Sequence, residues 1–203
     1  YLLAAYGVGS FPPGKTTVLS EDTLLDEFIP VVVDYLKMHA AIYNAIKEND
    51  TIDADGDGSN ADVGFTLSVG AFVPSRNNAV SEEADDVAAA DRVRYVYHYL
   101  FVESALNGTF DTDLDGEPDI DVPEAAGTVD WLGVQYYFRS GVTAKDALVP
   151  VLKVTPCFAN IDFGSCLPPV GDDKTKCVPA MKYEYYEPGL YEVLADFSQR
   201  WPD

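Results

Sequence analysis

Apolar residues recur at steps of three and four positions over residues 24–48, at Val32, Leu36, Ala40, Tyr43 and Ile46. This spacing places them on one stripe and predicts an amphipathic helix. Pro30 fits at or near the first helical turn, where its missing N–H costs little. His39 borders the stripe without a second His or Cys four residues on, so we predict that it packs against its neighbours and does not bind a metal.

Two further stretches rich in β-forming residues, 63–73 and 128–138, predict buried strands. Between them a helix is expected to start at Ser81, whose hydroxyl can cap the first turn and is followed by two acids at the positive end of the helix dipole. This helix should end near Leu106, before an Asn-Gly pair. The residues expected to face inward are Val93, Val96, Tyr97 and Leu100.

The rest of the chain predicts a loop over 1–21, a long irregular segment over 144–180 and a last helix over 188–201, with Pro188 in its first turn. Helices and strands alternate, which favours parallel strands joined by crossover helices. Two strands neither close a barrel nor form a stable sheet, so the pattern is typical of the middle of a repeating β/α array. Neither strand is followed by a Gly-x-Gly-x-x-Gly run, which argues against a dinucleotide-binding fold.

The charge of the chain narrows the choice of partners. Lys and Arg number 13 against 34 Asp and Glu, a net charge of −21, while the 47% hydrophobic content is ample for a packed core. Because so few cations cannot form a basic patch, neither nucleic acid nor an anionic membrane surface is expected as a partner. The sequence has no run of eighteen apolar residues, so it predicts no transmembrane helix. No basic region of a signal peptide is present, although the chain begins at Tyr1 and not at Met.

The three cysteines, Cys157, Cys166 and Cys177, fall in one stretch that contains Pro and Gly. Their spacings are not those of a zinc site, and an odd number allows one disulfide and a spare thiol, in any pairing. A disulfide that closes a loop would indicate a secreted or extracytoplasmic protein, and three inert thiols are the alternative.

Two loops, 53–62 and 111–121, place acids on alternate residues and a glycine after the third acid, as the first half of a calcium loop does. Position twelve holds Gly64 or Val122 in place of the Glu of an EF-hand, so both loops look more like the shorter Asp-rich loops of dockerins. The expected calcium ligands are Asp53, Asp55, Asp57, Ser59 and Asp62, and Asp111, Asp113, Asp115, Glu117 and Asp119. A metal there would stabilise a connection between a helix and a strand, and plain Asp-Gly turns are the alternative.

Several stretches occur in the order seen in glycoside hydrolase family 1, the β-glucosidase-like (β/α)8 barrels. They are YGVGSFPPGK, HAAIYNAIK, VGFTLSVGAFVPS, DVAAADRV, DWLGVQYYFRS and MKYEYYEPGLYEVLADFSQRWPD. The resemblance spans nearly the whole chain apart from the two acidic loops and the segment with the cysteines. It implies that residues 1–203 form part of one α/β domain, a partial (β/α)8 TIM barrel of about strands five and six with flanking helices. The loops 53–62, 111–121 and 144–180 would be additions to that barrel.

Family 1 enzymes are retaining glycosidases with one glutamate in an Asn-Glu-Pro motif ending the fourth strand and a second in a Glu-Asn-Gly motif ending the seventh. One carboxyl group protonates the leaving oxygen while the other attacks the sugar carbon. The present sequence contains neither motif; it starts like the segment that follows the first and ends like the segment that precedes the second. The resemblance therefore implies that both catalytic glutamates and the rest of the barrel lie outside this chain, and that no organic cofactor is needed.

The resemblance also implies three site residues. Tyr137 matches the family tyrosine after strand six, whose phenol hydrogen-bonds the nucleophile, and Gln135 stands where the family usually has Asn. Ser68 lies about where strand five often carries Asn, so Gln135 and Ser68 are expected to face the substrate. The alternative is that Tyr136 and Tyr137 only pack within the barrel.

We therefore expect part of a secreted, calcium-binding glycosidase that cleaves β-linked glucosides or galactosides, with no activity in this chain alone. Gln135 and Ser68 motivate a second hypothesis, a non-catalytic carbohydrate-binding protein derived from the barrel. A calcium-dependent adhesion or dockerin-like module is a third, although here a strand and a helix separate the two acidic loops. A partial barrel should also expose strand edges and apolar helix faces and fold poorly alone.

Overall fold

The computed structural model of the chain describes residue 9 and residues 11–157, 162–168, 177–178, 183–184 and 186–202. In chain order its elements are α1 (Glu21–Thr23), the π-helical turn η2 (Leu24–Phe28), α2 (Ile29–Asn49), β1 (Gly64–Arg76), β2 (Ala79–Val80), α3 (Ala84–Arg94), the π-helical turn η3 (Tyr95–Tyr99), α4 (Leu100–Asn107), β3 (Thr109–Phe110), β4 (Ile120–Asp121), the 3-10 turn η4 (Pro123–Ala125), β5 (Trp131–Thr143), β6 (Thr155–Pro156), β7 (Cys177–Val178), β8 (Tyr183–Glu184) and α5 (Pro188–Arg200).

The chain divides into two compact units. Unit 1 comprises Tyr1–Leu67 and His98–Gly133, and unit 2 comprises Ser68–Tyr97 and Val134–Asp203. The long strands β1 and β5 each begin in unit 1 and continue into unit 2. Among the described residues, none of the helices combines the length and the apolar character needed to cross a membrane.

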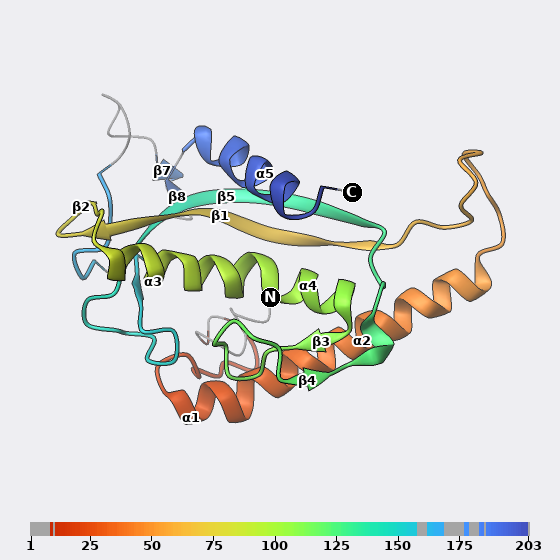
Figure 1. Cartoon of the computed structure of the whole chain (residues 1–203), viewed down its shortest axis with the longest axis horizontal. Coiled ribbons are helices and arrows are strands. Elements are labelled where there is room, and N and C mark those ends of the chain that lie inside the picture. The colour runs from red at the N-terminus through yellow and green to blue at the C-terminus, as the bar shows by residue number, and fades with distance from the viewer. Residues whose placement is uncertain are drawn as a thin grey trace. The chain divides into compact units, whose positions relative to one another are not determined.

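The strands β1 and β5 lie side by side in a four-stranded sheet of order β2-β1-β5-β6 (Figure 1). Near their starts, a Cβ on Gly64 would meet the carbonyl oxygen of Trp131. Further along, a Cβ on Gly70 would meet the ring of Phe138. Because these contacts advance together along both strands, β1 and β5 are parallel, which confirms the pairing predicted from the alternation of helices and strands.

Short strands extend the sheet only at the far ends of this parallel pair. β2 pairs antiparallel with Ser75 and Arg76 after a tight turn at Asn77–Asn78, where both residues have positive φ. β6 pairs antiparallel with Val142–Thr143. The predicted strands 63–73 and 128–138 are therefore confirmed in position, but both run on to a later residue, and the second starts at Trp131.

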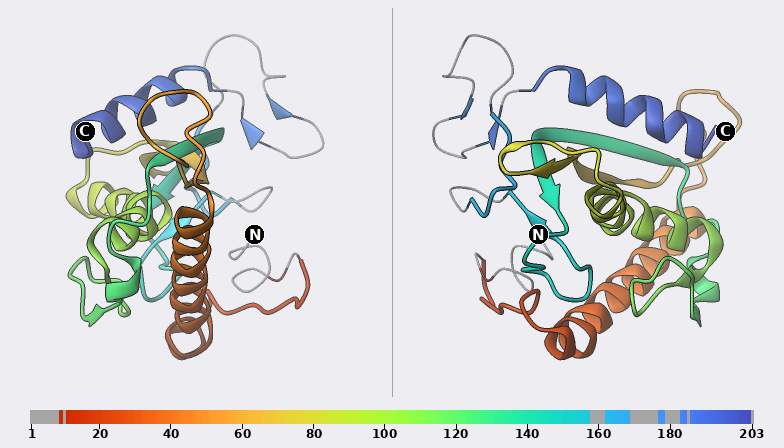
Figure 2. Two further views of the ribbon diagram at one scale, coloured as in Figure 1. Left: turned by 90° about the vertical axis from the view of Figure 1, so that its right-hand side faces the viewer. Right: turned by 60° about the vertical axis from the view of Figure 1, so that its left-hand side comes forward.

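The helix α2 is central to unit 1, where α4 and η4 pack against it (Figures 1 and 2). The ring of His39 lies edge-on to those of Phe65 and Phe101, and its Nε2 is 2.6 Å from the carbonyl oxygen of Thr128. The packing role predicted for His39 is confirmed. The residues of α2 that are buried are Ile29, Val32, Val33, Leu36 and Ala40.

The helical run that contains α2 begins earlier than its pattern predicted. Pro30 lies in the first turn of α2, as predicted, but α1 and η2 precede α2 without a break from Glu21. Proline has no N–H to donate to the preceding turn, and a π-helical turn accommodates such a local loss of hydrogen bonding. At the other end Ile46, placed on the buried stripe, is 39% exposed.

The helical run after β1 also departs from its predicted start. α3 begins at Ala84 with Glu83, and not Ser81, at its N-cap. The Oγ of Ser81 accepts the N–H of Glu83 at 3.2 Å and donates to the buried carboxylate of Asp86 at 2.6 Å. The end is as predicted: α4 stops at Asn107, and Gly108 follows in the left-handed region at φ 69°.

Of the residues predicted to face inward from this helical run, only one is fully buried. Leu100 is 5% exposed, whereas Val93, Val96 and Tyr97 are half-buried. The run is not a straight α-helix, because η3 intervenes between α3 and α4, and this shifts the buried side of the later residues.

The described residues between 144 and 168 are largely irregular, as predicted, and include a disulfide. Cys157 and Cys166 are bonded at an S–S distance of 2.07 Å, and the N–H of Cys157 donates to the carbonyl oxygen of Gly141 on β5. The backbone of Cys177 belongs to β7, and its side chain lies outside the described residues. The predicted disulfide is confirmed, and it joins Cys157 to Cys166.

A fully buried carboxylate, that of Asp86, joins four segments of unit 2. Arg76 donates to both of its oxygens, at 2.7 and 3.0 Å, and the hydroxyl of Ser81 donates at 2.6 Å. The hydroxyl of Thr143 and the N–H of Ala144 donate at 2.9 Å each. Burial acts to raise the pKa of Asp86, but these hydrogen bonds, led by that from Arg76, hold it well below its ordinary value.

Asp86→Asn should lower the free energy of unfolding by about 3 kcal/mol, because Arg76 loses its buried counter-charge. Since the native pKa of Asp86 lies below the unfolded one, its contribution is present above about pH 4 and is lost as the pH falls below that value. Urea unfolding at neutral and acid pH measures both effects. Asp85→Asn, at an exposed neighbouring position, is the matched control; equal losses in the two variants would contradict the role of Asp86.

Candidate functional site

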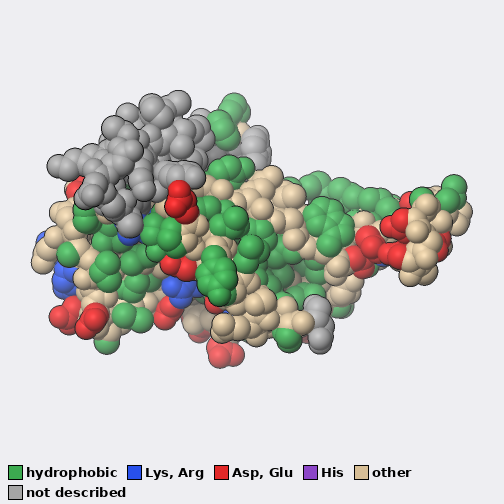
Figure 3. All heavy atoms as spheres, turned by 90° about the horizontal axis from the view of Figure 1, so that it is seen from above, with side chains coloured by type: hydrophobic (Ala, Val, Ile, Leu, Met, Phe, Trp, Pro, Cys, Tyr) green, Lys and Arg blue, Asp and Glu red, His purple; other side chains and the backbone are tan. Residues whose placement is uncertain are grey.

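The first acidic loop joins α2 to β1 in unit 1, as predicted. Carboxylate oxygens of Asp53, Asp55 and Asp57 lie within 4.8 Å of one another, and all three residues are exposed. Asp53 accepts the N–H groups of Gly56 at 2.7 Å and Gly58 at 3.1 Å. Both glycines have positive φ, which lets the backbone curl around the acids. The acidic side chains gather on this loop, at the right of Figure 3.

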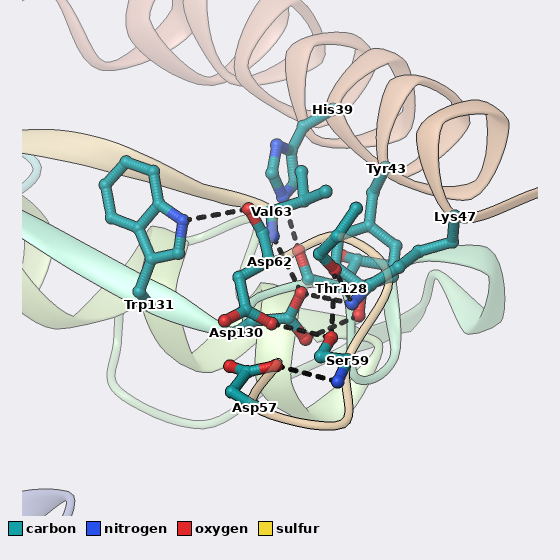
Figure 4. A network of polar contacts seen from close by, with 11 residues as sticks. His39, Tyr43, Lys47, Asp57, Ser59, Asp62, Val63, Thr128, Asp130 and Trp131 are labelled. Carbon is teal, nitrogen blue, oxygen red and sulfur yellow. Dashed lines mark hydrogen bonds and ion pairs between the residues drawn. The ribbon is translucent and has the colours of Figure 1, made fainter. Parts of the chain in front are cut away.

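The end of this loop is fixed by two hydrogen bonds (Figure 4). Ser59 Oγ donates to the carboxylate of Asp62 at 2.9 Å, and the indole N–H of Trp131 donates to the carbonyl oxygen of Asp62 at 3.2 Å. The predicted ligands Ser59 and Asp62 therefore bond to each other, and the group of clustered carboxylates does not include Asp62.

Asp130, just before β5, anchors the exit of the same loop to α2 (Figure 4). Its Oδ2 is 2.6 Å from Lys47 Nζ and accepts the N–H of Val63 at 2.8 Å, while its Oδ1 accepts the phenol of Tyr43 at 2.8 Å. Lys47 also donates to the carbonyl oxygen of Ala61. One carboxylate thus binds the helix before the loop and the strand after it.

The electrostatics of this network favour a charged pair. Burial acts to raise the pKa of Asp130, but the hydrogen bonds from Lys47, the N–H of Val63 and Tyr43 outweigh it, so the pKa is lowered. The same contact raises the pKa of Lys47. Sequence reasoning missed both residues, since nothing in either local pattern indicates a partner so far along the chain.

The second acidic loop is the tip of a short hairpin between β3 and β4, and is not the direct helix-to-strand connection that was predicted. Carboxylate oxygens of Asp111, Asp113 and Asp115 lie within 4.8 Å of one another. Asp111 is fully buried and accepts the N–H groups of Leu114 and Gly116 at 2.7 Å each. Desolvation, together with the neighbouring charge of Asp115 and the contact with Asp111, raises the pKa of Asp113.

The other two ligands predicted in the second loop are not in this group of carboxylates. The carboxylate of Asp119 accepts the N–H of Thr112 at 3.0 Å and its hydroxyl at 2.6 Å, which closes the hairpin. Glu117 donates its backbone N–H to Asp115 at 2.9 Å. Three acids in each loop are brought together, and the remaining predicted ligands shape the loops.

The residues predicted to face a substrate lie on the strands in unit 2. Tyr137 is 47% exposed, and its phenol donates to Gln135 Oε1 at 3.2 Å, so these two are brought together. Ser68 Oγ lies 3.2 Å from the phenol oxygen of Tyr97 on η3. Tyr97 was expected only as a core residue, and its contact with Ser68 depends on the crossover geometry and not on a local motif.

Tyr136, in contrast, has a clear packing role. Its phenol donates to the carbonyl oxygen of Tyr186 at 2.9 Å, and a Cβ on Gly189 would lie 2.1 Å from the same phenol oxygen. Only glycine fits at that position of α5. Tyr136 therefore packs against α5, as the packing alternative predicted, while Tyr137 is exposed in this chain.

Comparisons with known proteins place this fold among the β-glycosidases. No family model matches the chain. It is 29% identical over 197 residues to a β-galactosidase of Pyrococcus woesei, an alignment that covers 96% of this chain and 36% of that protein. A mutant rice β-glucosidase in a covalent complex with Glc matches with a TM-score of 0.69, at 17% identity, over 99% of this chain and 43% of that one. A family 1 β-glucosidase of Thermotoga maritima matches with a TM-score of 0.65, at 16% identity, over 98% and 38%.

The fold class is therefore that of a mixed α/β structure matching part of a β-glycosidase barrel. The predicted resemblance to glycoside hydrolase family 1 is confirmed: the chain is similar in sequence to a β-galactosidase and in fold to a family 1 β-glucosidase. It spans less than half the length of the relatives that it matches.

Asp130→Asn should loosen the base of the first acidic loop, because the amide cannot balance the charge of Lys47 and offers only one acceptor oxygen. We expect the free energy of unfolding to fall by about 1–3 kcal/mol and the Val63 amide to exchange faster with solvent. Hydrogen exchange read by NMR or mass spectrometry measures the second effect. Glu48→Gln, at the exposed position beside Lys47, should change neither; unaltered exchange at Val63 in Asp130→Asn would refute the anchoring role.

Proposed function

We propose that this chain is part of a retaining β-glycosidase that cleaves β-linked glucosides or galactosides. The observation that carries the proposal is the 29% identity to a β-galactosidase along 96% of the chain. In such a reaction one carboxyl group protonates the leaving oxygen and a carboxylate attacks the sugar carbon, and water then releases the sugar. The sequence contains neither of the two motifs expected for these acids, so both are assigned to polypeptide outside these residues.

Within the proposed enzyme, β1 and β5 would be strands five and six of the barrel, and Gln135, Tyr137 and Ser68 would face the sugar. The hydrogen bond between Tyr137 and Gln135 supports this assignment, since it brings two of these three side chains together. The phenol of Tyr137 would hydrogen-bond the attacking carboxylate and keep it ionised. The disulfide Cys157–Cys166 supports an exported location, where such bonds persist.

The activity test uses the complete reading frame that contains these residues. Its product should hydrolyse an aryl β-glucoside or β-galactoside, while the 203-residue chain alone should not. In the complete product, Tyr137→Phe should lower kcat by about ten- to a hundred-fold, the effect of one hydrogen bond to a charged group. Tyr191→Phe, at an exposed site on α5, should leave kcat unchanged.

Two outcomes of this test would contradict the proposal. Turnover by the isolated chain would show that the catalytic acids lie within it. A complete product that binds sugars without hydrolysing them, and that lacks one of the two glutamates, would favour the non-catalytic carbohydrate-binding protein.

We also propose that each acidic loop holds one structural calcium ion. The support is the alternation of acids with glycine at position six and the gathering of three carboxylates in each loop. The ligand set is narrower than the sequence indicated: Asp53, Asp55 and Asp57 in one loop, and Asp111, Asp113 and Asp115 in the other. Because both loops connect elements of unit 1, the ions would act on its stability.

Calcium at about 100 times its dissociation constant should raise the free energy of unfolding by about 2.7 kcal/mol per site. Calorimetric titration should find two sites, with dissociation constants of about 10⁻⁴–10⁻³ M as in extracellular modules. Asp55→Asn should remove one site and Asp113→Asn the other, while Glu124→Gln, outside both loops, should keep both. No heat of binding, and the same melting temperature with calcium and with chelator, would refute the proposal.

A further inference from the structure

The helix α2 carries apolar side chains on two separate faces. The first face is the buried one that packs within unit 1, with Leu36 and Ala40 fully covered. The second is a stripe at steps of three, four and four residues, exposed to 45%, 49%, 51% and 39%: Tyr35, Met38, Ile42 and Ile46. Ala41 and Ala45, also exposed, border it on the helix.

Polar side chains on α2 are concentrated on the arc between these two faces. Asp34, Lys37, Asn44 and Glu48 follow one another at steps of three, seven and four, and all are exposed. A surface helix of a complete domain has one apolar stripe and polar residues on its other faces, whereas α2 is apolar over most of its circumference. An exposed row of four large apolar side chains marks a surface that another element covers.

The identity of the covering element follows from the fold. In a (β/α)8 barrel the helices form an outer ring, so that each has a neighbour on either side. The solved β-glycosidases that match this chain are more than twice as long as the part that it covers, at 43% and 38%. The small residues Ala41 and Ala45 leave room for a helix axis to approach closely. Two copies of this chain would repel each other, since each carries a net charge of −21.

We propose that the stripe Tyr35, Met38, Ile42 and Ile46 is the docking face for the adjoining helix of the same barrel, supplied by polypeptide outside these 203 residues. This inference rests on the proposed function only in requiring a longer barrel, and not on catalysis. The partner is an amphipathic helix whose apolar face meets the stripe.

Oxidation of Met38 by hydrogen peroxide, read by mass spectrometry, reports directly on this face, because the thioether reacts only when it is accessible. In the 203-residue chain Met38 should oxidise at nearly the rate of the urea-unfolded chain. In the product of the complete reading frame it should oxidise at least about ten-fold more slowly. Sedimentation should show that the protected product is a monomer.

A pair of variants tests the face without relying on methionine. Ile42→Glu should lower the melting temperature of the complete product by about 4 °C or more, because it places a charge in a packed interface. In the isolated chain it should have little effect, since the site is exposed. Asn44→Glu, on the polar arc of the same helix, should be neutral in both.

Three outcomes would overturn the proposed docking face. Met38 that stays accessible in the complete product, or a reading frame with no further barrel, removes the proposed partner. Protection already present in the 203-residue chain would mean that the chain covers its own face. Protection that depends on concentration and is abolished by Ile42→Glu would make a second copy the partner. A protected but catalytically inactive product would refute the proposed activity and leave this inference standing.

Discussion

The parallel pairing of β1 with β5 is the constraint on which the rest of the structure depends. Parallel neighbours cannot be joined by a tight turn, so the chain between them must return along the sheet through a crossover, and α3, η3 and α4 are that crossover. β2 and β6 pair with only two residues each of the 13-residue strands. Over the described residues, most of the outer edge of both strands therefore has no strand partner. Long edges of this kind are usual for strands taken from the middle of a sheet and costly for strands at a finished edge.

The acids of this chain serve two different purposes. Asp86 and Asp130 each bind a cation and a backbone N–H at the end of a long strand. Asp86 is fully buried, so water does not compete for its bonds. The acids of the two loops accept mainly backbone N–H groups within their own loop. Of the 13 basic residues against 34 acids, Lys47 and Arg76 bind carboxylates at the ends of the long strands.

Local patterns in the sequence predicted the elements better than their ends or their contacts. The helix over 24–48, the glycine that ends α4 and the two β-rich stretches depend on neighbouring residues alone, and all of these elements form, although Ile46 of the predicted buried stripe is exposed. The predicted cap at Ser81 is wrong because α3 starts two residues later, with Glu83 at its N-cap; the hydroxyl of Ser81 binds the buried carboxylate of Asp86, which is also bound by Thr143 far along the chain. The calcium loops were predicted residue by residue, yet Ser59 and Asp62 bond to each other because the end of that loop is fixed by Asp130 and Trp131.

In the proposed complete active site, the hydrogen bond between Tyr137 and Gln135 would be replaced by one to the attacking carboxylate. At 3.2 Å the bond from a phenol to a neutral amide oxygen is long, and it contributes little to stability at an exposed position. A carboxylate is a stronger acceptor than an amide, so a nucleophile brought within reach would take the phenol from Gln135 at small cost. The longer side chain of glutamine would then be free to turn towards the sugar. The departure from the usual Asn is thus compatible with a working site, since it gives Tyr137 a weak partner that a carboxylate can replace.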